Sequence, residues 1–166
     1  MDLATPRLRL RPLAQGDLDA LLAIWSDPAV APVLYPRGLP PRERVDAWLA
    51  QRVSTPPRIF LVHVDGGADP VGYAGIQPLP ETGEPELFYA MRGAAWGRGY
   101  ATEACEAVLA HARGALRLPR LVAVVLPSNR RSARVLEKLG FRAVGTTEHA
   151  GLPHARYERG LGLTSS

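Results

Sequence analysis

The chain has 166 residues, of which 46% are hydrophobic and 22% charged, which is the length and composition of one globular domain over residues 1–166. No apolar run approaches the roughly 20 residues that span a bilayer, so we expect a soluble protein rather than one embedded in a membrane. The net charge of +4 comes almost entirely from dispersed arginines, which favours an anionic ligand and argues against a dedicated nucleic-acid binder.

The first part of the chain predicts one strand and two helices. Leucine alternates with arginine from Arg7 to Leu13, which is the period of a half-buried strand. A short helix opens at Gly16 and stops at Pro28, with an apolar face formed by Leu18, Leu21, Leu22 and Trp25. After a proline-rich loop, a second helix is expected, with an apolar stripe of Val45, Trp48 and Leu49.

The middle of the chain predicts a hairpin, a third strand and a long helix. Two runs rich in β-branched and aromatic residues, 59–64 and 71–76, are separated by a turn. A further turn leads to a strand over 86–91. Apolar residues then recur at spacings of three and four over 101–116, which predicts a helix in whose buried stripe Cys105 packs as a small hydrophobe.

The last part of the chain predicts a buried strand, a helix and two more strands. The continuous apolar run over 121–126 is typical of a strand covered on both faces and parallel to a neighbour. Asn129 is expected to cap a helix that ends at Leu139, with Gly140 in the left-handed conformation. Strands over 141–147 and 155–161 then complete a mixed α/β sheet.

A glycine-rich turn, AAWGRGYATEA, joins the strand over 86–91 to the helix over 101–116. Free N–H groups and the macrodipole at the start of a helix favour an anion, and Gly97 and Gly99 let the backbone approach a phosphate closely. Arg98 adds a full positive charge. The turn lacks the Gly-Lys-Ser/Thr of a P-loop and has Thr102 in place of a third glycine, so ATP and NAD fit poorly.

Three motifs together carry a resemblance to a known family. In order along nearly the whole chain they are TPRLRLRPLAQGDLDAL, WGRGYATEA and SNRRSARVLEKLGF. With them the sequence resembles the GNAT acetyltransferases, specifically the RimJ/RimL branch that acetylates the N-termini of ribosomal proteins. The resemblance implies a twisted, mostly antiparallel sheet flanked by helices. In that sheet the strands over 86–91 and 121–126 are parallel and splayed apart.

The resemblance also implies acetyl-CoA as the cofactor. Its pantetheine arm would lie between the splayed strands, bonding the main chain near Met91 and Arg92, with Asn129 and Ser132 beside it. Trp96 stands where the family usually has Arg or Gln, a departure that is harmless if amides bind the ligand. Those amides would wrap the pyrophosphate and belong to Gly97, Arg98, Gly99, Tyr100, Ala101 and Thr102.

Acetyl transfer needs a neutral amine and a proton source for the leaving thiolate. An α-amine has a pKa of about 7.7 to 8.0 and is more readily deprotonated near pH 7 than a lysine amine, whose pKa is about 10.4. We therefore expect a protein or peptide N-terminus as the acceptor. Ser132 matches the position that the branch uses to donate to the thiolate. We expect Glu86 to be the base, acting through water, with Glu148 as the rival.

Several residues have two interpretations. Tyr35, Tyr73, Tyr89 and Tyr157 fit core positions or a pocket wall. His149 and His154 lie near Glu148, but without a further ligand cluster we expect no metal. The densest basic patch fits either a contact to the 3′-phosphate of CoA or solvated helix surface, and it consists of Arg130, Arg131 and Arg134.

The acceptor and the partners are less defined by the sequence. A small amine such as an antibiotic, polyamine or amino acid is an alternative acceptor, because acceptor choice depends on the loops over 29–41 and 78–85. A non-catalytic acyl-CoA sensor and, more weakly, RNA association through the arginines are alternative functions. An edge strand makes a homodimer reasonable. The absence of a signal-peptide pattern and the single cysteine indicate a cytoplasmic protein.

Overall fold

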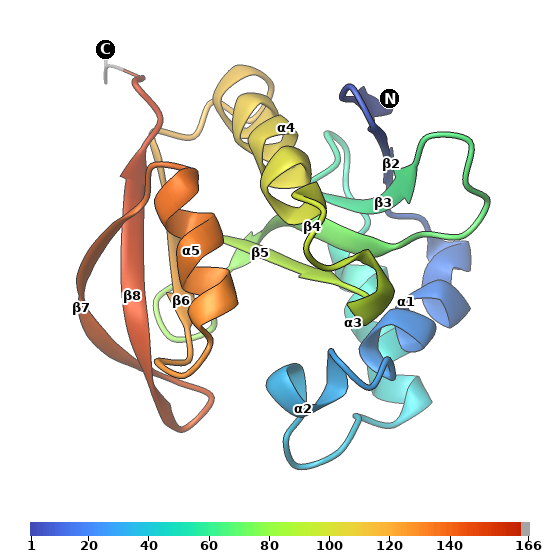
Figure 1. Cartoon of the computed structure of the whole chain (residues 1–166), viewed down its shortest axis with the longest axis horizontal. Coiled ribbons are helices and arrows are strands. Elements are labelled where there is room, and N and C mark those ends of the chain that lie inside the picture. Colours follow the sequence, from blue (N-terminus) through green and yellow to red (C-terminus); the bar gives the residue numbers. More distant parts are fainter. Residues whose placement is uncertain (164–166) are drawn as a thin grey trace.

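The computed structural model describes residues 1–163, which form an eight-stranded sheet flanked by helices (Figure 1). The strands are β1 (Leu3–Ala4), β2 (Leu8–Pro12), β3 (Ile59–Val64), β4 (Gly72–Pro78), β5 (Pro85–Met91), β6 (Arg120–Val125), β7 (Arg142–His149) and β8 (Leu152–Gly160). The helices are α1 (Leu18–Trp25), α2 (Ala31–Leu34), α3 (Arg42–Arg52), α4 (Tyr100–Gly114) and α5 (Arg130–Lys138). None of these helices has the length and apolar character that crossing a bilayer requires.

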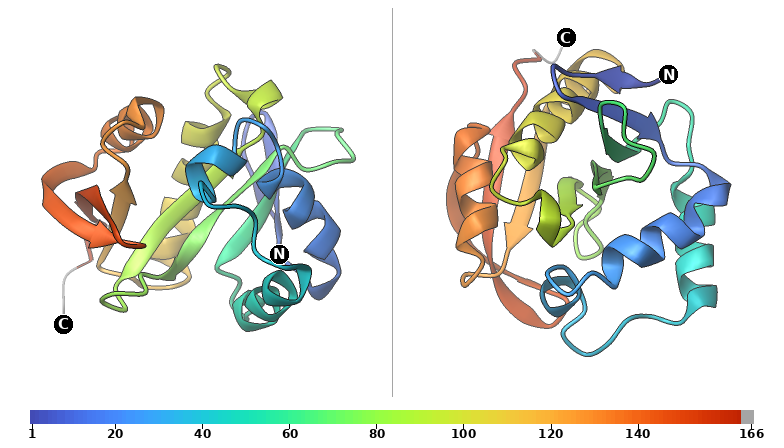
Figure 2. Two further views of the ribbon diagram at one scale, coloured as in Figure 1. Left: turned by 90° about the horizontal axis from the view of Figure 1, so that it is seen from below. Right: turned by 45° about the vertical axis from the view of Figure 1, so that its right-hand side comes forward.

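The sheet consists of two halves that meet at one point. Its strand order is β1-β2-β3-β4-β5-β6-β8-β7, and β5 and β6 are its parallel pair. These two strands share one registered pair, Glu86 with Val122, whereas the ladder of β4 and β5 runs from Gly72 and Met91 to Pro78 and Pro85. Beyond Glu86 the strands diverge (Figure 2). The predicted sheet, with its parallel and splayed central strands, is confirmed.

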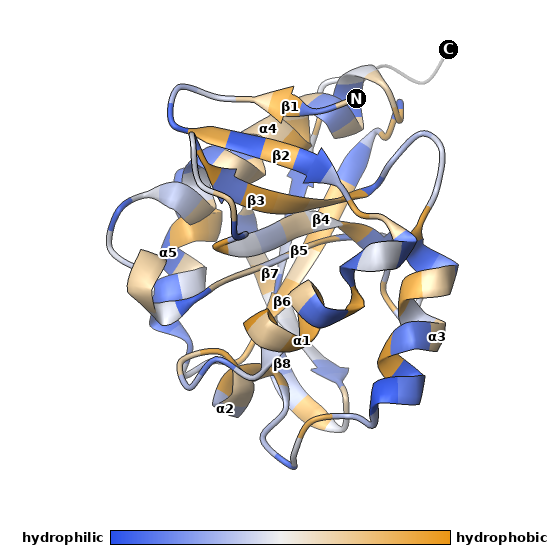
Figure 3. Ribbon diagram, turned by 90° about the vertical axis from the view of Figure 1, so that its right-hand side faces the viewer, coloured by the Kyte–Doolittle hydropathy of each residue, from blue (hydrophilic) through white to orange (hydrophobic). Residues whose placement is uncertain are grey.

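Alternating side chains divide each strand between core and solvent. In β2, Leu8 and Leu10 are buried while Arg9 is exposed, and Figure 3 shows this alternation along the strand. The hydrophobic effect therefore selects one face of the strand for the core, as the leucine and arginine pattern predicted.

Helices cover the sheet on both faces. On one face α4 and α5 pack on a core that includes Leu87 and Met91 of β5. On the opposite face α1 and α3 pack on a second core, and Phe88 and Ala90 of β5 lie against it. Strand β5 thus contributes side chains to both cores, because successive residues point to opposite faces of a sheet.

The ends of α5 follow the predicted capping pattern. Asn129 Oδ1 accepts a hydrogen bond from the Ser132 amide at 3.1 Å, so Asn129 is the N-cap. At the other end Gly140 has a φ of 82°, and the amide of Phe141 donates to the carbonyl of Leu136 at 3.0 Å. Cys105 is fully buried in α4, as predicted, and burial raises the pKa of its thiol.

Three elements differ from the sequence prediction. The segment 29–41, expected to be a loop, contains the single helical turn α2, where proline favours the first turn of a helix. Strand β1 was not predicted, because its two residues are too few to show an alternation of polar and apolar side chains. Strand β8 begins at Leu152 rather than at residue 155, because its ladder with β7 continues to the pair of His149 and Leu152. Such an outer hairpin pairs through its backbone and needs no apolar alternation.

Candidate active site

The backbone of β5 exposes hydrogen-bonding groups where β6 has diverged. The Arg92 amide donates to the carbonyl of Val71 at 2.8 Å, so the even-numbered residues of β5 direct their main-chain groups toward β4. The main-chain groups of Tyr89 and Met91 therefore face the gap between β5 and β6. The indole Nε1 of Trp96 donates to the Met91 carbonyl at 2.8 Å. Among residues 1–163, the amide of Met91 and both main-chain groups of Tyr89 have no partner and are available to a ligand that lies along β5.

The turn before α4 presents a row of free amides. Within residues 1–163, the N–H groups from Gly97 to Thr102 have no hydrogen-bond acceptor, and the first that does belongs to Glu103, whose amide donates to the Gly99 carbonyl at 3.1 Å. Gly97 and Gly99 are left-handed, with φ of 76° and 79°. Such a turn at a helix N-terminus is a concave site for an anion.

Two hydroxyl groups meet where α5 approaches β5. Tyr89 Oη lies 2.7 Å from Ser132 Oγ and also donates to the Ser132 carbonyl at 3.2 Å. Burial raises the pKa of Tyr89, so this phenol keeps its proton at neutral pH. The pair lies on the face of the sheet that α4 and α5 cover, and either hydroxyl can present a proton to the gap.

Glu86 is a buried carboxyl on the other face of β5. Glu86 precedes Phe88 by two residues in the strand, so its side chain points to the same face of the sheet, the one that α1 and α3 cover. The residue is 5% exposed. Burial raises the pKa of Glu86 to about 7, against the lowering effects of His149 and of a 3.4 Å hydrogen bond from Gln77. Glu86 is therefore a buried residue and does not lie at a solvent-facing end of the strand. A carboxyl that titrates near neutral pH suits a general base.

Two hairpin turns meet near Glu86. His149, at the end of β7, places its Nδ1 3.0 Å from Glu81 Oε1 in the turn between β4 and β5. The ring of His154 packs edge-on against that of His149, with centroids 5.0 Å apart. Within residues 1–163 no group of three or more His, Cys, Asp or Glu side chains is arranged to hold a metal ion.

A hollow of about 350 Å³ and one of about 330 Å³ indent the surface, and the smaller lies on the Glu86 side of the sheet. Its wall residue Trp48 packs edge-on against Phe88, with ring centroids 6.4 Å apart, and Phe88 is the neighbour of Glu86 on that face. The hollow therefore lies on the same face of the sheet as the buried carboxyl. It is lined by Trp25, Tyr35, Gly38, Leu39, Pro40, Pro41, Arg44, Val45 and Trp48.

Comparison with known proteins identifies the family of this chain. The family model of the acetyltransferase (GNAT) domain matches residues 7–142. The chain belongs to the GNAT acetyltransferase family. It is 28% identical over 148 residues to the uncharacterized N-acetyltransferase p20 of Bacillus licheniformis, an alignment that covers 86% of this chain and 83% of that protein.

Solved GNAT structures share the fold. A GNAT-family acetyltransferase from Bordetella pertussis is 27% identical, with a TM-score of 0.84 over 96% of this chain and 99% of that one. A RimL ribosomal L7/L12 α-N-protein acetyltransferase in complex with coenzyme A has 15% identity and a TM-score of 0.76, covering 96% and 97%. At that identity the likeness shows the fold. GNAT acetyltransferases use acetyl-CoA, so the protein is an acetyl-CoA-dependent N-acetyltransferase.

The GNAT fold brings most of the predicted site residues to one gap. The turn over 97–102, Met91, Asn129 and Ser132 surround it on one face of the sheet, and Glu86 lies on the other. Both main-chain groups of Arg92 are already engaged, since its amide donates to Val71 and its carbonyl accepts from the Ala95 amide at 2.9 Å. A main-chain contact to the cofactor therefore fits Met91 better than Arg92.

Other predicted residues lie at the margin of this gap. Glu148 is exposed, and because it precedes His149 in β7, its side chain points to the opposite face from that ring. Arg130 and Arg134 are exposed on α5. Arg131 stacks its guanidinium 4.2 Å from the centre of the Trp96 ring.

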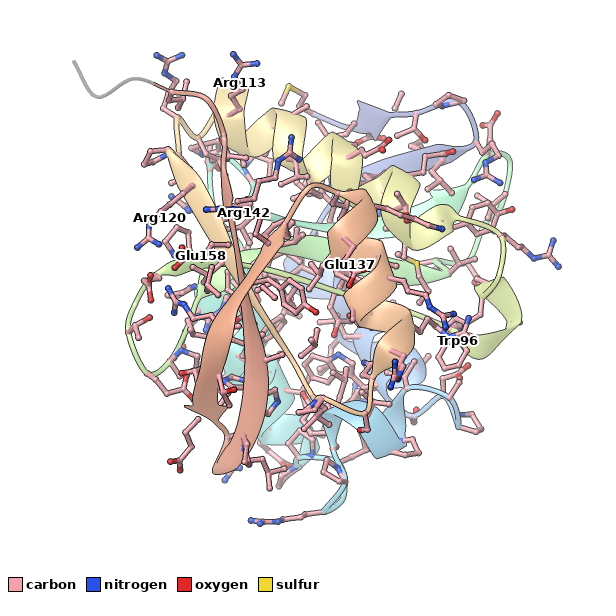
Figure 4. All side chains as sticks on the ribbon, turned by 60° about the vertical axis from the view of Figure 1, so that its left-hand side comes forward. Trp96, Arg113, Arg120, Glu137, Arg142 and Glu158 are labelled. Carbon is pink, nitrogen blue, oxygen red and sulfur yellow. The ribbon has the colours of Figure 1, made fainter. Side chains whose placement is uncertain are left out.

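Sequence reasoning missed the contacts that Tyr89 and Trp96 make. Tyr73 and Tyr157 are buried and Tyr35 packs beside Trp25, as the core interpretation expected, but the Tyr89 hydroxyl contacts Ser132. No local signal separates Tyr89 from the others. Trp96 links the turn to β5 through Met91 and lies beside the first turn of α5 (Figure 4). The sequence did offer one signal for Trp96, since this residue departs from the family motif at its position.

Proposed function

We propose that the protein transfers the acetyl group of acetyl-CoA to a primary amine presented on the Glu86 side of the sheet, and that this amine is the N-terminal α-amine of a protein or peptide. One observation carries the proposal: Glu86 and the pair of Tyr89 and Ser132 approach the same gap from opposite faces. A base and a proton donor are thereby separated by the space that a thioester would occupy.

The gap and the turn fit coenzyme A. The amides from Gly97 to Thr102 would bind its diphosphate, and the amide of Met91 with the main chain of Tyr89 would bind the pantetheine arm. Asn129 would border that arm while it caps α5. When bound, acetyl-CoA supplies the activated acetyl carbonyl.

The side chains of the gap then have defined proton-transfer roles. Glu86 accepts a proton from the acceptor amine, directly or through one water, as the new carbon–nitrogen bond forms. Tyr89 Oη or Ser132 Oγ donates a proton to the departing sulfur as the carbon–sulfur bond breaks. The proton that Glu86 has gained leaves to solvent and the donor hydroxyl takes one back, so a neutral amine and the thioester give the amide and the CoA thiol with no net release of a proton.

The pKa of Glu86 favours an α-amine over a lysine. Moving a proton from an α-ammonium group of pKa about 7.7 to 8.0 to a carboxylate of pKa about 7 costs only about 1 kcal/mol. The same transfer from a lysine ammonium of pKa about 10.4 costs about 4 to 5 kcal/mol. The pKa of Glu86 therefore suits the deprotonation of an N-terminal α-ammonium group better than that of a lysine.

A panel of acceptors tests this proposal. Release of free CoA is measured with a peptide that has a free N-terminus, with the same peptide N-acetylated but carrying an internal lysine, and with small amines. The free N-terminus is expected to give the highest kcat/KM. Release of CoA with small amines alone would refute the acceptor assignment.

A small amine is the second candidate acceptor. The hollow of about 330 Å³ beside Trp48 favours it, since an aromatic wall of this size suits one apolar side group. The same panel decides between the two acceptors, because polyamines, amino acids and aminoglycosides are among its small amines. The sensor alternative fits less well, because membership of the GNAT acetyltransferases makes the chain an enzyme.

A further inference from the structure

Arg7 reaches from the beginning of the chain to the turn before α4. It lies between β1 and β2, yet its Nε donates to Glu103 Oε1 at 2.9 Å and its Nη1 donates to the Arg98 carbonyl at 2.8 Å. Its guanidinium carbon also lies 4.7 Å from the centre of the Tyr100 ring. A single side chain therefore contacts the turn, the first helical residue and the first turn of α4.

The contact to Arg98 orients the next amide. The Arg98 carbonyl and the Gly99 N–H belong to one planar trans peptide, in which the two groups point in opposite directions. Because the carbonyl is held by Arg7, the Gly99 N–H points away from Arg7, and this amide has no acceptor within residues 1–163. Fixing the carbonyl thus fixes the direction of a donor in the amide row.

The contact to Glu103 removes a charge conflict. A carboxylate in the first turn of α4 would repel a diphosphate bound at the same helix end. Glu103 Oε2 accepts from Thr5 Oγ1 at 2.7 Å and from the Arg7 amide at 3.2 Å, in addition to the Oε1 bond. Although desolvation opposes the shift, these hydrogen bonds lower the pKa of Glu103. The carboxylate is ionised at neutral pH and its charge is paired.

We propose that Arg7 is a positioning residue for coenzyme A: it orients the amides of the turn and neutralises Glu103, so that the diphosphate meets aligned donors and no uncompensated negative charge. This inference rests on the proposed site for the cofactor. Arg7 acts through the turn and needs no contact with the reacting atoms.

The test compares Arg7→Ala with Arg9→Ala. Arg9 is a matched control because its side chain is 52% exposed against 47% for Arg7, and it pairs with Asp2 at 3.8 Å, away from the turn. Calorimetry with CoA should show Arg7→Ala raising Kd about tenfold and Arg9→Ala changing it by less than about twofold. At saturating acetyl-CoA, kcat of Arg7→Ala should stay within about twofold of the unaltered protein, because the chemical step is untouched.

A double variant separates positioning from loss of structure. Adding Glu103→Gln to Arg7→Ala removes the unpaired charge and should restore CoA affinity by about threefold, which repair of folding alone would not do. If Arg7→Ala does not fold, Arg7→Lys can be used instead. It keeps the positive charge but lacks the planar guanidinium group with its several N–H donors, so it should raise the Kd for CoA by about threefold.

Two results would overturn the role of Arg7: a Kd for CoA that is equal in the unaltered protein, Arg7→Ala and Arg9→Ala, or no recovery of affinity in the double variant. Failure of the unaltered protein to bind CoA would instead refute the proposed function. The two failures are therefore distinguishable.

Discussion

The two sides of the gap between β5 and β6 offer different kinds of chemical group, main-chain amides on one side and a buried side chain on the other. On the side of α4 the candidate anion site consists of main-chain amides from consecutive residues, shaped by Gly97 and Gly99. On the opposite side the candidate base is one side chain, Glu86, whose properties come from burial beneath separate segments. A site made of backbone depends on local conformation, whereas a site made of a buried carboxyl depends on what covers it.

This difference predicts different sensitivities. Changing a side chain in the turn leaves its amides in place, unless the change alters φ at a glycine or the anchoring of the turn by Arg7. Changing Glu86 removes the buried carboxyl beside the gap, whose pKa burial raises to about 7. Substitutions on the two sides should therefore affect different kinetic constants.

The largest expected effect is on turnover by Glu86→Gln. The amide cannot accept the amine proton, so kcat should fall by about 10²- to 10³-fold, while KM for acetyl-CoA stays within about twofold. Steady-state assays of CoA release at pH 7.5 or so measure both constants. The matched control is Glu148→Gln, which removes the rival carboxyl from an exposed position and should leave kcat unchanged. A large loss in Glu148→Gln with none in Glu86→Gln would reverse the assignment.

Glu86→Gln should also stabilise the fold above neutral pH. The folded protein holds the Glu86 proton up to pH about 7, whereas the ordinary pKa of the side chain is 4.5, so ionisation favours unfolding as the pH rises through this window. The variant should gain about 2 to 3 kcal/mol at pH 8 and nothing at pH 4. Denaturant unfolding at both pH values measures the gain. An equal change at both would show that burial does not perturb Glu86.

Tyr89→Phe should lower kcat by about 10- to 50-fold with little change in KM, because the departing sulfur loses one proton donor and Ser132 remains. Ser132→Ala should have an effect of similar size. Tyr157→Phe is the control, since Tyr157 is equally aromatic and buried in the core. If Tyr89→Phe and Tyr157→Phe lose the same activity, the hydroxyl of Tyr89 has no role in the chemistry.

The smallest expected effect is on cofactor affinity, from Gly97→Ala. A Cβ at Gly97 meets no atom within 4 Å, but the residue has a φ of 76°, which alanine adopts at a cost of about 1 kcal/mol. Relief of that strain misaligns the amides, so Kd for CoA should rise about tenfold while kcat is kept. Gly66→Ala has the same open space at a φ of 78° in the turn between β3 and β4, and it should change stability alone. Equal CoA affinity in the two variants would contradict an amide-built site.

Much of the cofactor side was predictable because its determinants are local. The glycines, the cap formed by Asn129 and the apolar run that becomes β6 each act within a few residues, so the pattern of the chain reveals them. The site residues themselves stay predictions, as do the single-domain extent, a homodimer and a cytoplasmic location. The cofactor, acetyl-CoA, is confirmed through the family.

The acceptor side could not be predicted to the same extent, because its determinants are distant in sequence. Glu86 has no local feature that distinguishes it from Glu84, yet Glu84 pairs with Arg156 and Arg120, which lower its pKa to about 2, while burial raises that of Glu86 to about 7. Likewise, the contact of Tyr89 with Ser132 spans 43 residues.

By itself, then, the sequence determined most of the strands and helices in chain order, the glycine-rich turn and the family. The tertiary structure alone decided which carboxyl is buried, which hydroxyls meet and which distant arginine anchors the turn. The physical reason is that backbone conformation follows from neighbouring residues, whereas desolvation and charge pairing depend on whatever the folded chain places alongside.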